Sequence, residues 1–218
     1  MHTEKWILAG ALLVTAGQAW SADGAGSPWT VRLGPAHVGF STEADVRVNG
    51  ELVPGGGAEA SGNTTLGFEL SYALTDRWTA RLLAGIPPTT TLSGTGALAS
   101  AGTLGKVNYG PAAATLTYHL LNEGMLRPYV GAGLNYTIVF KSEDGFISNL
   151  DARSAFGSVL QLGVDMPLDS TWTLSADARK IFLKTKADGV LPAMGGAAAH
   201  ADVRLDPLVV FVSIGRKF

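Results

Sequence analysis

The sequence predicts an all-β fold: an eight-stranded antiparallel transmembrane β-barrel with long extracellular loops and short periplasmic turns. Three observations predict it. Apolar residues recur at every second position in eight segments, which is the period of a strand with one apolar face. The connections between these segments alternate between short and long, as in outer-membrane barrels. The chain also ends on an aromatic residue, Phe218, that continues the apolar face of residues 208–218, a segment long enough for a tilted strand to cross a bilayer.

The composition excludes several classes of protein. The 218 residues carry a net charge of −2 and their 16 basic residues are scattered, so we expect no nucleic-acid partner. No apolar run is long enough for a transmembrane helix, which needs about 18 residues. The chain has no cysteine, and its histidines and carboxylates do not cluster at ligand spacing. We therefore expect no metal site and no cofactor.

Residues 1–19 resemble a secretory signal peptide. Lys5 supplies positive charge, residues 6–16 are apolar, and Gly17-Gln18-Ala19 offers small residues for cleavage after Ala19. An N-terminal core helix is the alternative, but the apolar run is short and small, flexible residues follow it. We expect an exported chain whose barrel occupies residues 20–218.

The first four predicted strands lie in the N-terminal half. The first spans residues 29–40, where Trp29, Val31 and Leu33 share the apolar face. Its Gly34-Pro35 pair is expected to form a β-bulge, because proline cannot donate to a ladder. The same alternation covers the next three predicted strands, residues 63–74, 78–86 and 108–120.

The last four predicted strands complete an even number. Residues 129–140 set large apolar side chains against Gly131 and Gly133, and residues 155–168 repeat this pattern. The seventh strand begins at Trp172. The eighth covers residues 203–218, with a bulge expected at Asp206-Pro207.

The predicted connections alternate in length, which fixes the orientation of the barrel. Three are short: residues 75–77, 121–127 and 169–171. Four are long and rich in glycine or polar residues: residues 41–62, 87–107, 141–154 and 185–202. The long loops should lie outside the cell and the short turns in the periplasm.

With this orientation, outward-facing aromatic residues gather at the periplasmic ends of the strands. Such rings form a girdle at a membrane–water interface. The expected girdle consists of Trp29, Tyr72, Trp78, Tyr118, Trp172 and Phe218. Phe140 and Phe156 could belong to the opposite girdle.

The inward faces carry the charged residues of the strands. Arg or Lys facing lipid at mid-bilayer costs about 2–4 kcal/mol, so these side chains belong in the lumen. They are Arg32, Glu69, Arg81, Asp165, Asp177, Arg179 and Lys217. Glu69 and Arg81 lie on neighbouring predicted strands and can pair. Eight strands leave an interior just wide enough for side chains or one small ligand, which disfavours a wide aqueous pore.

The placed strands resemble those of the outer-membrane protein W (OmpW) family. The resemblance covers essentially all of the chain after the predicted signal peptide. It rests on Arg127–Thr137 (RPYVGAGLNYT), Gln161–Asp165 (QLGVD) and Val203–Pro207 (VRLDP) before the Phe-terminated strand. Leu66–Phe68 and Tyr72–Asp76 fit as well.

The resemblance implies a narrow, largely apolar barrel that passes small hydrophobic molecules across the outer membrane. It also implies a lumen blocked partway and an exit sideways through the barrel wall. Leu83 matches the family's apolar constriction by position. Arg179 stands near the place of a large aromatic expected opposite it, so Phe211 or Ile181 would have to fill that space.

Two functional classes remain open. The first is a channel or carrier for small hydrophobic molecules, and the second is a structural or surface-interaction barrel whose loops bind a partner while its lumen is closed. We do not expect an enzyme: His119 is the one histidine at an inward strand position, and the serine that barrel lipid-trimming enzymes place two residues away is missing. The expected partners are outer-membrane lipid, a small hydrophobic ligand, and the barrel-assembly machinery through the strand that ends in Phe218.

Overall fold

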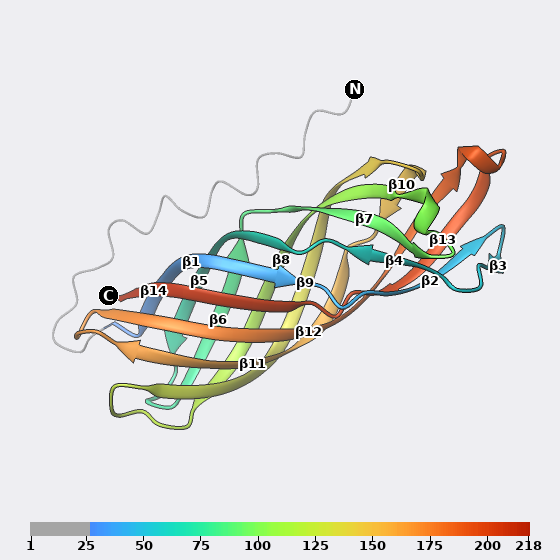
Figure 1. The fold of residues 1–218 in the computed structure, drawn as a ribbon. Helices are drawn as coiled ribbons and strands as arrows, with labels where there is room; N and C mark the ends of the chain where they lie inside the picture. The colour runs from blue at the N-terminus through green and yellow to red at the C-terminus, as the bar shows by residue number, and fades with distance from the viewer. Residues whose placement is uncertain (1–26) are drawn as a thin grey trace.

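Eight antiparallel strands close into a barrel in the computed structural model, which describes residues 27–218 (Figure 1). Around the barrel they follow the chain order, and the last pairs with the first. They are β1 (Trp29–Gly39), β5 (Asn63–Ala73), β6 (Trp78–Gly85), β8 (Thr103–His119), β9 (Arg127–Asp144), β11 (Ala155–Pro167), β12 (Trp172–Leu191) and β14 (Leu208–Lys217). The predicted fold class is confirmed. The predicted signal peptide lies outside the described residues.

The seam between β1 and β14 closes the barrel over its full height. Their register runs from Thr30 opposite Lys217 to Gly39 opposite Leu208. The backbone N–H of Phe218 also donates to the carbonyl of Trp29 at 3.1 Å. The C-terminal segment therefore completes the cylinder, and the C-terminus lies at the end of the barrel that carries the short turns (Figure 1).

Side chains on the barrel strands alternate between two environments. The outward residues are apolar and exposed: Phe156 is 75% exposed and Leu134 67%. Charged residues are buried inside, where Arg179 is 0% and Glu69 1% exposed. This is the reverse of a water-soluble protein and matches a barrel surrounded by lipid. Among residues 27–218, no helix is long and apolar enough to cross a membrane.

The four long connections, expected to be loops, are mostly β-structure. They form β2 (Glu43–Val48), β3 (Glu51–Leu52), β4 (Gly56–Ala60), β7 (Thr89–Gly96), β10 (Ser148–Ala152) and β13 (Ala197–Arg204), with 3₁₀ turns at η1 (Ala99–Ala101) and η2 (Pro192–Met194). Together with the outer ends of β8, β9 and β12 they make an outer extension of the barrel (Figure 1). Strand pairing gives their backbone groups partners. Alanine, glycine and threonine make up at least half of β4, β7 and β13, which weakens the apolar alternation that would reveal these strands.

Two expected bulges are absent. Leu33 pairs with Ile214 and Ala36 with Phe211 in one unbroken register across Gly34-Pro35. Pro35 points outward, and a Cβ on Gly34 would lie 1.9 Å from the Val212 carbonyl oxygen. Gly34 therefore allows β1 and β14 to approach closely, and the register of their pairing does not shift.

The chain at Asp206-Pro207 interrupts the predicted last strand without changing its register. Lys184 pairs with Arg204 in β13, and Lys180 pairs with Leu208 in β14, so equal numbers of residues separate the two pairs. Pro207 has no N–H, and the Asp206 carboxylate accepts a hydrogen bond from the Leu183 N–H instead (3.1 Å). The predicted strand is thus two strands in one line.

Asp188 links three segments of the outer extension. Its Oδ1 lies 2.6 Å from His200 Nδ1, and its Oδ2 accepts a hydrogen bond from Arg153 at 2.7 Å. The contact with His200, and then that with Arg153, lowers the pKa of Asp188. A carboxylate with a lowered pKa stabilises the folded hairpin above its ordinary pKa, and this contribution is lost as the pH falls through the lower value.

We therefore expect the β12–β13 hairpin to loosen in acid. NMR amide protection factors there should begin to fall as the pH drops through the ordinary aspartate pKa of about 3.9 and should keep falling below it, through the lowered pKa of Asp188. In Asp188→Asn the hairpin should show low protection throughout and no such change. Equal pH dependence in both proteins would contradict this role of Asp188.

Candidate functional site

A layer of ion pairs fills the periplasmic half of the lumen. Glu69 Oε1 accepts hydrogen bonds from Arg32 (2.6 Å) and Arg81 (3.2 Å), and its Oε2 accepts one from Arg179. Asp165 Oδ2 binds the same Arg32 (3.0 Å) and Arg81 (2.9 Å). The carboxylate of Glu69 thus joins arginines from three strands that closure of the barrel brings together.

The remaining members of the layer complete its charge balance. Asp177 Oδ1 accepts a hydrogen bond from Arg179 Nε at 2.8 Å. The Arg81 guanidinium carbon lies 4.0 Å from the centre of the Tyr129 ring, within the range of a cation–π contact. His119 Nε2 lies 3.1 Å from Asp165 Oδ2. Three arginines face three carboxylates, and all six side chains are buried, so they fill the lumen at this level.

Next to this layer, on the side of the outer extension, the lumen becomes apolar. Leu83, Ile181 and Phe211 belong to one buried cluster, in which Phe211 is fully buried. The other members of the cluster are Ala36, Val38, Ala113, Val159, Leu183 and Val209. Arg179 belongs to the ion layer instead, with its guanidinium carbon 5.9 Å from the centre of the Phe211 ring. Phe211 is therefore the large aromatic of the apolar layer.

An apolar cavity of about 130 Å³ lies beyond this cluster, inside the outer extension. Its walls come from the inner faces of the barrel rim and of the extension strands. They include Val38, Phe40, Val107, Tyr109, Leu150 and Leu183. Phe40 and Tyr109 meet edge to face, with ring centres 5.9 Å apart. The cavity offers an uncharged molecule apolar and aromatic surface.

The barrel wall has a gap between β6 and β8. The β6–β8 ladder ends where Leu83 faces Ala113, and pairing with β8 resumes where Thr89 of β7 faces Asn108. Between these points the described residues have a single backbone bond across the gap, from the Tyr109 N–H to the Pro88 carbonyl (3.1 Å).

Proline makes this gap. Pro87, Pro88 and Pro111 have no N–H to donate, and the Ile86 N–H turns away to the Leu66 carbonyl of β5 (3.0 Å). A small cavity of about 20 Å³ opens at this place. It is lined on the wall side by Leu83, Ala84, Gly85, Pro111 and Ala113, and on the lumen side by Arg179, Ile181 and Val209, among others.

A sequence model of the OmpW family matches residues 26–218 of this chain. The chain belongs to the OmpW family. It is 43% identical over 207 residues to the dibenzothiophene metabolism operon protein PahQ of Pseudomonas aeruginosa, covering 95% of each chain.

Solved structures of the family share the fold. The crystal structure of the outer membrane protein OprG from Pseudomonas aeruginosa matches with a TM-score of 0.81 and 27% identity, covering 88% of this chain and 97% of that one. The solid-state NMR structure of outer membrane protein AlkL in DMPC lipid bilayers matches with a TM-score of 0.72 and 27% identity, covering 91% and 95%. This OmpW-family chain is therefore an outer-membrane β-barrel.

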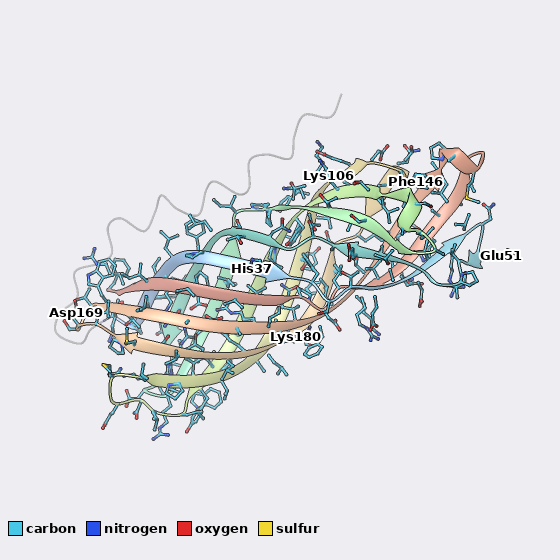
Figure 2. All side chains as sticks on the ribbon, in the orientation of Figure 1. His37, Glu51, Lys106, Phe146, Asp169 and Lys180 are labelled. Atoms are coloured by element: carbon cyan, nitrogen blue, oxygen red, sulfur yellow. The ribbon has the colours of Figure 1, made fainter. Side chains whose placement is uncertain are left out.

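The six aromatics expected at the periplasmic girdle of this OmpW-family barrel lie on its outer face near the short turns. Trp29 packs against Tyr72 with ring centres 4.7 Å apart, and Trp78 against Tyr118 at 5.0 Å. The Arg216 guanidinium carbon lies 5.9 Å from the centre of the Trp172 ring and 5.3 Å from the centre of the Phe218 ring. We propose that these six rings form the interfacial girdle. Figure 2 shows Asp169, from the β11–β12 turn, at this same end.

Two features of the OmpW-family site depart from the sequence prediction: the position of Lys217, and the wall gap, which that prediction does not include. Lys217, expected inside, is exposed at the periplasmic rim, because β14 ends there. The sequence predicts residues 108–120 as one regular strand and so does not predict the wall gap. Pro111 within that strand and the Pro87-Pro88 pair opposite it are the signals that could have revealed an interrupted ladder.

The ion layer does not contain a metal site. Among residues 27–218, no group of three or more histidine, cysteine or acidic side chains is placed to hold a metal ion. Asp165, which His119 contacts, already binds two arginines and the Ser175 hydroxyl (2.8 Å). His119 is thus a member of the ion network.

Proposed function

We propose that this OmpW-family barrel takes up small hydrophobic molecules into its apolar cavity and releases them sideways into the bilayer through the gap between β6 and β8. The observation that carries the proposal is the order of three features along the lumen. An apolar cavity opens onto an apolar cluster, the wall is unpaired beside that cluster, and a layer of ion pairs closes the lumen below it.

The cavity favours uncharged apolar ligands. Moving apolar surface out of water gains about 25 cal/mol per Å², and the side chains facing this cavity are largely apolar. Phe40 and Tyr109 add aromatic surface, which packs well against a flat ring system. The name of the relative PahQ, a dibenzothiophene metabolism operon protein, supports the same chemical class, an uncharged aromatic compound.

The ion layer favours a sideways exit. A molecule passing straight to the periplasm would have to separate Glu69 and Asp165 from their arginines, and isolating buried charges is costly. The wall gap, by contrast, is bordered by Leu83, Ala84 and Pro111. An apolar molecule leaving there separates no ion pair and meets only neutral hydrogen bonds, from the Tyr109 N–H and the Asn108 side chain to the Pro87 and Pro88 carbonyls. We propose that Leu83 and Phe211 form the constriction between cavity and gap.

The closed lumen also favours the second candidate, a structural or surface-interaction barrel that binds a partner through its outer extension. The two candidate functions differ in the expected effect of a substitution inside the lumen. Only transport depends on the apolar path at Leu83.

The test is the uptake of an uncharged fluorescent polycyclic aromatic compound by Gram-negative cells with and without the protein. We expect the protein to raise the initial rate of uptake. Leu83→Arg should return it to the rate of cells lacking the protein, because a charged side chain then lies in the apolar path. Leu83→Met, which conserves volume, should stay within about twofold of the unmodified protein.

Equal amounts of folded protein in the membrane must be shown for each variant. If neither the protein nor Leu83→Arg changes the rate of uptake, the transport proposal is wrong and the surface-interaction barrel is favoured.

A further inference from the structure

Two cations face each other on the outside of the barrel without a matching pair of anions. Lys184 of β12 pairs directly with Arg204 of β13, and both side chains are exposed. Like charges directly opposite each other on neighbouring strands are destabilising. Lys184 has no ion-pair partner among the described residues. Arg204 forms an ion pair with Glu43, whose side-chain oxygen lies 3.3 Å from the guanidinium nitrogen and whose side chain is 77% exposed.

These two cations lie in an outer groove of about 340 Å³. Its lining comes from β12, β13 and β2, which lie side by side in the outer extension. Lys184, Arg204 and Glu43 form the row nearest the barrel, with two positive charges and one negative. The next row outward is Lys186, Asp202 and Asp45, with one positive charge and two negative. Positive charge is therefore concentrated in the row nearest the barrel.

The groove stands at the outer surface of the bilayer. On β12, Phe182 is the last exposed large apolar residue, and it follows Trp172 by ten positions. At about 3.3 Å per residue and the usual strand tilt, ten residues rise about 25 Å, the height of the apolar band of such barrels. Lys184 is the next outward residue. Lys180, also on the outside of the barrel (Figure 2), donates to the Asp206 carbonyl near the same boundary.

We propose that this groove binds the phosphate groups of lipopolysaccharide, the phosphorylated glycolipid of the outer leaflet. A phosphate between Lys184 and Arg204 converts their repulsion into two charge-assisted hydrogen bonds. The acyl chains below would meet the exposed apolar side chains of β12 and β11, among them Phe182 and Phe156. The carboxylates of the outer row disfavour a general polyanion, so the site suits a small anion fixed at the membrane surface.

The test compares the binding of bisphosphorylated lipid A and of dephosphorylated lipid A by the purified full-length barrel in detergent. The variant is Lys184→Gln with Arg204→Gln. The matched control is Lys106→Gln with Lys141→Gln, which removes two exposed cations from the β8–β9 side of the extension. Inorganic phosphate is added as a competitor.

We expect the unmodified protein to prefer bisphosphorylated lipid A. A basic residue at a membrane surface contributes roughly fivefold, so the double variant should bind it about 30-fold more weakly, and the control within about threefold of the unmodified protein. Equal loss in variant and control, or equal affinity for both lipids, would overturn the proposal. So would effective competition by inorganic phosphate, because the groove would then recognise free anions.

Folding is checked by thermal unfolding without lipid. The double variant should be at least as stable as the unmodified protein, because the repulsion between the two cations is removed. If it does not fold, Lys184→Gln alone, which keeps the Arg204–Glu43 pair, is used in the same comparison, and it should bind bisphosphorylated lipid A about fivefold more weakly.

Discussion

Replacing Glu69 by alanine is expected to lower the free energy of unfolding by about 3–5 kcal/mol. Glu69 contacts Arg32, Arg81 and Arg179, all of them buried. Its removal leaves these guanidinium groups with two carboxylates in place of three, in a lumen where water cannot replace the missing partner freely. Urea unfolding of the refolded barrel in lipid vesicles, followed by tryptophan fluorescence, measures the change.

Glu43→Ala is the matched control for this prediction. Glu43 also pairs with an arginine, but its side chain is 77% exposed, and exposed pairs contribute about 0–1 kcal/mol. A loss for Glu69→Ala no larger than that for Glu43→Ala would show that the ion layer does not hold the barrel together.

Locking the wall gap is expected to reduce uptake of the aromatic probe to the rate of cells without the protein. Ala84 and Ala112 are outward residues on opposite sides of the gap, and the chain has no cysteine of its own. Ala84→Cys with Ala112→Cys, joined by a short reducible thiol crosslinker, would tie β6 to β8 where no ladder does. Reduction of the crosslink should restore uptake.

The control uses the same two strands where they are already paired. Ala80 lies opposite Leu116 in the regular part of the β6–β8 ladder, so crosslinking Ala80→Cys to Leu116→Cys should leave uptake unchanged. Uptake that persists with the gap locked would mean that the molecules leave the barrel by another path.

The strands could be predicted from the sequence because their signal is local. Alternation of apolar and small or polar residues identified all eight barrel strands, and it assigned Arg32, Glu69 and Arg81 to the interior. A strand places every second residue on the same face whatever its neighbours are. The expected pair of Glu69 and Arg81 also followed from strand adjacency, and the two side chains lie 3.2 Å apart.

The outer extension had no such signal. Residues 197–201 read Ala-Ala-Ala-His-Ala, and residues 56–58 are two glycines and an alanine. Small side chains on both faces leave no apolar period, yet these residues form parts of β13 and β4 because pairing satisfies their backbone groups. Gly34-Pro35 also could not be interpreted from the local sequence. Its proline suggests a β-bulge, but β1 and β14 pack closely there and keep one unbroken register.

The sequence by itself determined the number of barrel strands, the two faces of each of them and the order of long and short connections, since each depends on residues near one another in the chain. Only the tertiary structure decided which charges meet and where the wall opens. Arg32 already faces Glu69 across the paired strands β1 and β5, but Arg179 of β12 reaches Glu69, and Asp165 of β11 reaches Arg32, only when the cylinder closes. The gap arises because the prolines of two separate segments come to face each other across one ladder, a register that no single segment specifies.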